Sequence, residues 1–151
     1  MLDFTNGEIR LPELTVNSAL TLQKAIEAFG NKLVLEEFYT IECGEKVLTS
    51  TWLHFNQPPQ VSDDFLLTTL VFDKNGYIHC ISLLPREPAE TEEECNVLLQ
   101  KVATLAQDAG GWPFIGVVWK FPWGRLDYDG DCPLGTFHRI SFVYMYLYHF
   151  L

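Results

Sequence analysis

The stretch that decides the fold is Phe137-His138-Arg139-Ile140-Ser141-Phe142-Val143-Tyr144-Met145-Tyr146-Leu147-Tyr148-His149-Phe150-Leu151. Side chains alternate between the two faces of a strand. One face of this segment carries a ladder of aromatic residues and the other carries mainly aliphatic ones. Aromatic and β-branched residues favour strands. A segment this apolar on both faces cannot be a free edge without inviting aggregation. We therefore predict one long strand that lies inside a sheet or is covered by helices or by a partner.

Two hairpins are predicted upstream of this strand. Residues 65–72 and 77–84 are joined by Asp73-Lys74-Asn75-Gly76, where the glycine can supply a positive φ. Both of its strands are apolar on both faces, which predicts a central position in the sheet. Residues 33–43 and 46–55 form a second hairpin around a turn at Gly44-Glu45.

Two helices are also predicted. The first carries apolar residues at helical spacing and ends at Gly30-Asn31. The second begins with Thr91 and Glu94 placed as a capping box, and it stops at Gly110-Gly111. Candidate N-caps for the first helix are Thr15, Asn17 and Ser18.

The order of these elements predicts an α+β fold. An Asn6-Gly7 turn indicates a short hairpin at the start, and residues 114–121 predict a further strand that Pro122 interrupts. Runs of hairpins with helices set apart favour a mainly antiparallel sheet with helices packed on it. We predict a single domain over residues 1–151, with about six to seven strands and two helices.

The charge balance narrows the classes of partner. The chain has a net charge of −10, and residues 1–109 hold 17 acids and 7 bases, so they account for all of it. An acidic protein repels phosphate backbones, so direct binding of nucleic acid is disfavoured and we predict a basic protein as the partner. The alternative is that the acidity only keeps the protein soluble.

The cellular compartment is predicted from two targeting signals that we do not find in the sequence. No apolar run reaches the roughly 20 residues that span a membrane, and the first residues do not form a signal peptide. We therefore expect a cytoplasmic protein that does not bind a membrane. The cysteines are far apart, none is in a CxxC pair, and we expect them to be reduced: Cys43, Cys80, Cys95 and Cys132.

Motifs for catalysis, metals and cofactors are weak. Asp127-Tyr128-Asp129-Gly130-Asp131 resembles the start of a calcium loop, but Cys132 and His138 stand where that loop needs glycine and glutamate. His79 and Cys80 are neighbours in a strand, so their side chains point to opposite faces and cannot form a dyad. We predict no catalytic, metal or cofactor residues.

The aromatic residues of the last forty positions suggest an interface. Tyrosine and tryptophan offer a large rigid surface with a polar tip, and same-face tyrosines need partners for their hydroxyls, which favours a partly wet surface. Core packing is the alternative. The predicted partner-binding residues are Trp112, Trp119, Trp123, Tyr128, Asp127, Asp129, Asp131, Tyr144, Tyr146 and Tyr148.

The layout resembles that of small bacterial immunity proteins. The resemblance lies in Phe4-x-Asn6-Gly7, in a helix that closes on Phe29-Gly30, and in Trp123-Gly124-Arg125-Leu126, which leads through Asp127 and Asp129 to a closing strand over residues 140–146. Proteins of this kind are cytoplasmic partners that inactivate a cognate toxin. The resemblance assigns no role to any single residue.

The sequence predicts a non-catalytic binding module, an immunity or inhibitor protein that neutralises a basic toxin or effector domain. A second hypothesis is a small-ligand protein or an enzyme whose apolar pocket uses polar groups such as His54, His79 or Arg125. A third is self-association, with the terminal strand or the aromatic face forming a homodimer.

Overall fold

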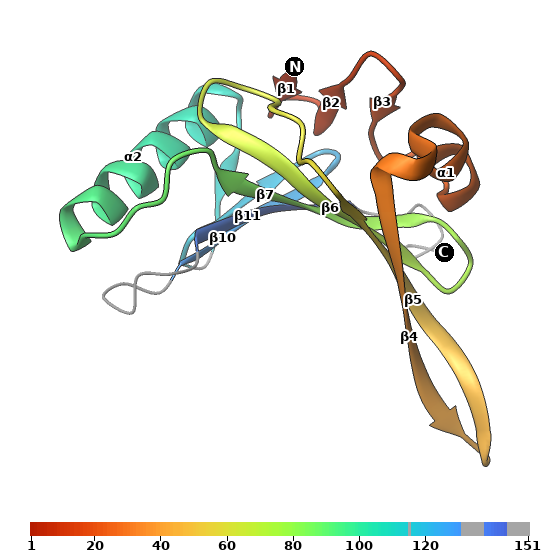
Figure 1. Ribbon diagram of the computed structural model, residues 1–151. Helices are drawn as coiled ribbons and strands as arrows, with labels where there is room; N and C mark the ends of the chain where they lie inside the picture. Colours follow the sequence, from red (N-terminus) through yellow and green to blue (C-terminus); the bar gives the residue numbers. More distant parts are fainter. Residues whose placement is uncertain (115, 131–137, 145–151) are drawn as a thin grey trace.

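The computed structural model describes residues 1–114, 116–130 and 138–144. Within these residues the chain is α+β, with one eight-stranded antiparallel sheet, a three-stranded sheet and two α-helices (Figure 1). The predicted class is confirmed. The predicted count of six to seven strands is too low, because strands of two or three residues show no alternation that could be recognised in a sequence.

The main sheet has the strand order β4-β5-β6-β7-β11-β10-β9-β8, and its neighbours are antiparallel. The predicted central hairpin is the pair β6 and β7. The predicted inner strand is β11, which lies between β7 and β10. The strands are β4 (Leu33–Glu42), β5 (Glu45–Phe55), β6 (Phe65–Asp73), β7 (Ile78–Pro85), β8 (Trp112–Pro113), β9 (Val118–Phe121), β10 (Gly124–Gly130) and β11 (His138–Tyr144).

The alternation predicted for the last strand is present in β11. Ile140, Phe142 and Tyr144 are buried, while the residues between them are only partly buried. The predicted continuation over residues 145–151 lies outside the described residues. The aromatic side of the ladder, as far as it is described, therefore faces the core.

The core lies between the main sheet and a layer of smaller elements. Helix α2 (Glu92–Asp108), the three-stranded sheet and helix α1 (Leu22–Phe29) lie along one side of the main sheet (Figure 1). One row of paired, buried residues crosses five strands beneath them and forms the centre of this core: Leu53, Leu70, Ile81, Phe142 and Leu126.

The two helices begin at threonines. The Thr91 hydroxyl accepts a hydrogen bond from the Glu94 amide at 3.1 Å, as predicted for α2. The Glu94 carboxylate accepts from the amide of Glu90 rather than from that of Thr91, so the capping box closes one residue early. Helix α1 is capped by Thr21, whose hydroxyl accepts from the Lys24 amide at 3.3 Å.

The three candidate N-caps named for α1 are therefore wrong. Thr15 lies in strand β3 (Thr15–Val16), and the side chain of Asn17 instead accepts from the Ala19 amide in a turn. Ser18 follows in the same turn. The helix ends as predicted, at Gly30 with φ of 54°, and a short 3₁₀ turn, η1 (Gly30–Lys32), leads into β4.

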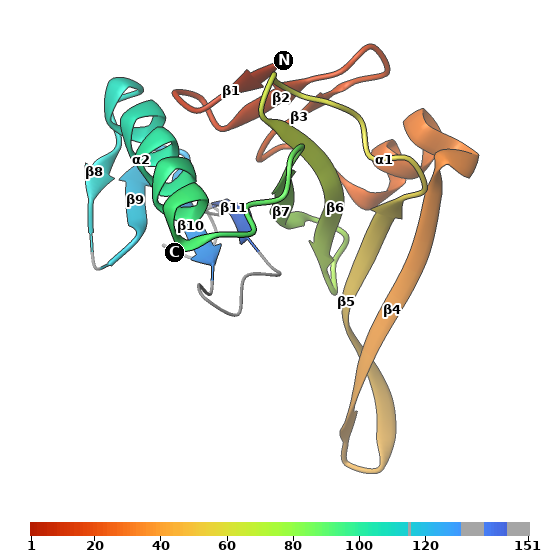
Figure 2. The same cartoon turned by 60° about the vertical axis from the view of Figure 1, so that its left-hand side comes forward.

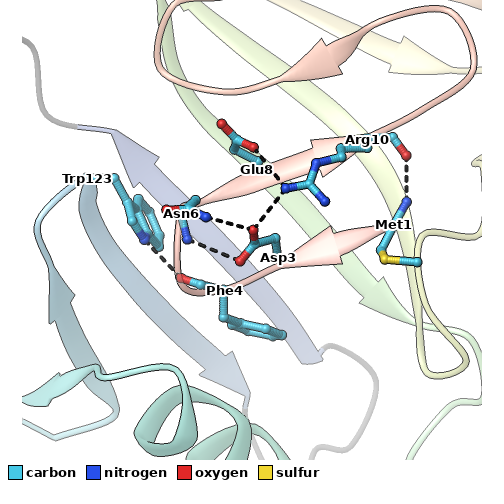
Figure 3. A network of polar contacts seen from close by, with 7 residues as sticks. All are labelled: Met1, Asp3, Phe4, Asn6, Glu8, Arg10 and Trp123. Atoms are coloured by element: carbon cyan, nitrogen blue, oxygen red, sulfur yellow. Dashed lines mark hydrogen bonds and ion pairs between the residues drawn. The ribbon is translucent and has the colours of Figure 1, made fainter.

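The small sheet is hydrogen-bonded to residues that lie more than a hundred positions later in the chain. Strands β1 (Leu2–Asp3) and β2 (Glu8–Arg10) pair around the predicted Asn6-Gly7 turn. The indole Nε1 of Trp123 donates to the Phe4 carbonyl at 2.9 Å (Figure 3). The buried carbonyl of Gly7 accepts from the Tyr144 hydroxyl, also at 2.9 Å.

A polar network closes the same hairpin. The amide and side chain of Asn6 donate to the Asp3 carboxylate at 3.2 and 3.0 Å, and Arg10 lies 3.4 Å from it (Figure 3). The hydrogen bonds from Asn6 are the main reason that the pKa of Asp3 lies below its usual value. The folded turn therefore favours the ionised form of Asp3.

Pro122 interrupts the strand that the sequence predicts over residues 114–121, as expected. Only Val118–Phe121 forms a strand, β9, and Pro122-Trp123 is a tight connection to β10. Gly124 follows, with a φ of 152°, and a Cβ there would lie 2.1 Å from the carbonyl oxygen of Val143. A side chain at this position is incompatible with the pairing of β10 and β11.

Candidate partner-binding surface

The hairpin of β4 and β5 extends well beyond the body of the molecule (Figure 2). Strand β4 pairs with β5 along its whole length, from Leu33 to Glu42. Strand β6 pairs with β5 only at residues 50–54. Residues 39–48 therefore form an arm that other strands of the sheet do not accompany.

Strand β4 has an unusual burial pattern for a strand of ten residues. Leu33 is half-buried, and the nine residues that follow it in β4 are exposed. Ile41 has 71% of its surface exposed. Single exposed apolar residues are ordinary, but five of them along one strand, spread over both of its faces, favour an interaction site. The row consists of Val34, Leu35, Phe38, Tyr39 and Ile41.

The tip of the arm is a two-residue turn with its own local contacts. Cys43 and Gly44 have φ of 50° and 81°, as the turns that suit a right-handed strand twist require. The predicted turn at Gly44-Glu45 is thus displaced by one residue, since Glu45 begins β5. The Lys46 ammonium lies 4.2 Å from the centre of the Tyr39 ring, across the two strands.

The arm and the first part of β4 carry a net negative charge. We define residues 33–48 as the β4 surface. It holds four glutamates and one lysine, so its net charge is −4 + 1 = −3. The hydroxyl of Tyr39 donates to the Glu37 carboxylate, and this hydrogen bond is the main reason that the pKa of Tyr39 is raised. Apolar and acidic groups are thus interleaved on both faces of β4.

An aromatic cluster supports the root of the arm. The rings of Phe38 and Trp52 lie 5.0 Å apart, and Trp52 lies 6.0 Å from the His54 ring. The two ring nitrogens of His54 contact the Glu36 carboxylate and the Thr69 hydroxyl, each at 3.2 Å. These contacts tie β4 through β5 to β6, so the exposed strand has a fixed base.

The tryptophans and tyrosines predicted from the sequence are divided between core and surface. Trp119, Tyr128 and Tyr144 are buried, so in this structure they face the core and not a partner. The expectation of a wet surface for the tyrosine hydroxyls does not hold for Tyr144, because its hydroxyl bonds to a backbone carbonyl. Trp123 is half-buried against the N-terminal hairpin.

Trp112 is the one predicted aromatic residue that is largely exposed among those the structure describes, at 74%. It lies in β8, at the opposite edge of the main sheet from β4. Phe114 beside it is also exposed, and the Lys120 ammonium lies 3.9 Å from the centre of its ring. This second surface is small and separate from the β4 surface.

Two of the three predicted acidic residues, Asp127 and Asp129, lie on the side of the sheet away from the helices. The Asp127 carboxylate accepts from Arg125 at 3.0 Å, and Asp129 lies 3.7 Å from Arg139. Each is balanced by an arginine of the same or the neighbouring strand. Asp131, Tyr146 and Tyr148 lie outside the described residues.

The features expected of a ligand pocket are not gathered in one place. A hollow of about 390 Å³ lies between residues 63–64 and the start of α2. Charged side chains dominate its lining, and Asp64 and Lys101 form an ion pair of 2.9 Å there. His54, His79 and Arg125 do not line it. Among the described residues there is also no cluster of metal-binding side chains.

No family model, curated protein or solved structure matches the chain. None of the helices in the described ranges is long and apolar enough to cross a membrane.

Sequence reasoning placed β4 correctly but did not recognise its exposure. A signal for it exists: Glu36 and Glu37 put a carboxylate on each face in the middle of the strand. Burying either face of a strand that carries a carboxylate on each face is costly unless the charges are paired. The apolar residues beside these glutamates could therefore have been recognised as surface residues.

Proposed function

We propose that this protein is a non-catalytic binding module, an inhibitor of the immunity type, which holds a basic toxin or effector domain at the β4 surface. The observation that carries the proposal is the exposure of β4. Nine of its ten residues are exposed, and they include a row of large apolar side chains. An apolar row of this kind can supply affinity once a partner covers it.

The charge of the β4 surface supports a basic partner. Its net charge of −3 attracts positive domains over distances of about 10 Å at moderate ionic strength. Complementary charge mainly raises the association rate and rejects wrong partners, whereas apolar anchors slow dissociation. The two properties of β4 therefore serve different steps of one binding event.

A test uses the toxin or effector domain encoded beside this protein, with affinity measured by calorimetry. Ile41→Asp places a charge within the apolar row, and we expect it to weaken binding at least 30-fold. Trp112→Asp is the matched control, because Trp112 is equally exposed but lies at the other edge of the sheet. We expect it to change affinity less than threefold.

The reverse pattern would move the binding site to the Trp112 surface that the sequence favoured. If neither substitution has an effect, or if no domain encoded nearby binds, the proposed function is wrong. Charge reversal at Glu36 and Glu37 gives a second readout. We expect it to slow association at low salt by at least tenfold and to have little effect at 0.5 M salt.

The homodimer hypothesis is less favoured at this surface. Two copies that met through β4 would bring their glutamates together, and like charges opposite each other destabilise paired strands. This repulsion concerns β4 alone, because the homodimer hypothesis placed the contact at the terminal strand or the aromatic face.

A further inference from the structure

The outer edge of β4 can be distinguished from the outer edge of β8. These are the two ends of the main sheet. Strand β8 has two residues, and one of them is Pro113, which has no amide hydrogen to donate. Strand β4 has ten residues and pairs on one side only. Of the two ends, β4 alone presents a long row of backbone groups.

The register identifies the backbone groups that point outward. The Lys32 carbonyl accepts from the Asn56 amide at 2.9 Å. In an antiparallel pair, residues alternate between those bonded to the partner strand and those directed away from it. Lys32 is bonded to the partner strand. Leu35 and Glu37 lie three and five residues after it, so they direct both their N–H and C=O groups away from β5. No hydrogen bond between described residues occupies these four groups.

Natural proteins usually protect such an edge from pairing. The features of β4 disfavour pairing with a second copy of this chain, but they do not disfavour pairing with a basic strand. Its pairing with β5 has a bulge at Phe38/Tyr39, beyond the outward groups of Leu35 and Glu37. Its glutamates repel a second copy, as described above, but they attract a strand that carries lysine or arginine. The edge of β4 therefore favours pairing with a basic strand over pairing with a second copy of this chain.

We propose that β4 binds its partner by strand addition: a basic strand of the partner protein pairs with the outer edge of β4 and extends the main sheet. This inference rests on the proposed function and specifies its mode. Main-chain hydrogen bonds to Leu35 and Glu37 would give affinity and direction. Lysine or arginine at alternate positions of the added strand would lie on one face of the sheet, beside Glu36 and Glu42 in one register or beside Glu37 in the other.

The probe for the test is a blocked peptide of about eight residues in which lysine and valine alternate. Binding is measured by calorimetry, and amide hydrogen exchange is followed by NMR with and without the peptide. We expect exchange at Leu35 and Glu37 to slow at least tenfold in the complex. Exchange in β8 should not change. A peptide of the same composition with proline at alternate positions should not protect β4.

Two substitutions separate the backbone from the side chain. Glu37→Pro removes the outward N–H and the carboxylate, whereas Glu37→Ala removes the carboxylate alone. Proline is tolerated at edge positions whose N–H faces outward, so the pairing with β5 should survive, and circular dichroism checks this. We expect Glu37→Pro to bind the peptide at least tenfold more weakly than Glu37→Ala.

Equal binding by the two variants would overturn strand addition, as would peptide binding without protection of Leu35 and Glu37, or no peptide binding at millimolar concentration. The exchange result on the unsubstituted protein decides the matter if Glu37→Pro does not fold. Failure of the proposed function looks different, because the peptide would then protect β4 while no toxin domain depends on Ile41.

Discussion

The hydroxyl of Tyr144 donates to the carbonyl of Gly7 at 2.9 Å, across a separation of 137 residues. Both groups are buried. The bond joins the inner strand β11 to the turn of the N-terminal hairpin, and the Trp123 indole holds the same turn through Phe4. The buried hydroxyl of Tyr144 therefore has a structural role, because it holds the N-terminal hairpin against the main sheet.

Substitution of this tyrosine should measure the bond. Tyr144→Phe keeps the ring but leaves the buried carbonyl of Gly7 without its donor. We expect a loss of about 1–3 kcal/mol in the free energy of unfolding, which urea denaturation would measure. Tyr39→Phe is the control, since that hydroxyl is on the surface and its loss should cost under about 0.5 kcal/mol. Equal losses would contradict the role given to Tyr144.

Gly7 should not tolerate a side chain. Its φ is 64°, and a Cβ there would lie 2.3 Å from the Trp123 ring. Gly7→Ala therefore combines backbone strain with an overlap, and we expect it to destabilise the protein by about 2–4 kcal/mol. Gly30→Ala is a matched control, because Gly30 has a φ of 54° with open space around it. It should cost only about 1 kcal/mol. The difference measures the overlap with Trp123.

The Asn6-Asp3 contact should make stability depend on pH. The pKa of Asp3 is lowered in the folded state, mainly by hydrogen bonds from Asn6. A group with a lowered folded pKa stabilises the protein above its unfolded value of about 3.9, and this stabilisation is lost as the pH falls through the folded pKa. We expect Asp3→Asn to reduce stability at pH 7.

At low pH the difference between the two proteins should vanish. Unfolding curves at pH 7 and pH 2 test this, and an unchanged difference would contradict the lowered pKa. NMR titration of the Asp3 carboxyl gives a direct check. Asn6→Ala should move that pKa upward, toward the usual value.

The cysteines should react with alkylating agents in a set order. Burial raises the pKa of Cys80 to about 11, so at pH 8 only about one thiol in a thousand is ionised. Cys43 is exposed at the tip of the arm. In a Cys132→Ser background, iodoacetamide followed by mass spectrometry should label Cys43 first and Cys80 at least 100-fold more slowly. Fast labelling of Cys80 in the folded protein would contradict its burial.

Local signals in the sequence predicted local structure well. Thr91 was identified as an N-cap because its partner stands three residues away, and Gly76, with φ of 82°, was identified because a short hairpin connection needs one such residue. The inner position of β11 followed from apolar residues on both of its faces. Each of these inferences uses residues that are neighbours in the chain.

Predictions failed where the answer depends on distant residues. Alternation shows that Phe142 and Tyr144 share a face, but it does not show what covers that face. The tyrosine hydroxyl was expected to need water, although its partner is the Gly7 carbonyl, which no local pattern reveals. For the same reason Trp119 and Tyr128 were assigned to a partner-binding surface, whereas the fold buries them.

The place of β11 between β7 and β10 has a consequence for how the chain acquires its fold. The strands β4–β7 and β8–β10 are synthesised first, yet they become one sheet only through β11. Until that strand leaves the ribosome, β7 and β10 each have an unpaired side, and contacts of such long sequence separation form slowly. The nascent chain should therefore need protection from aggregation until β11 has left the ribosome.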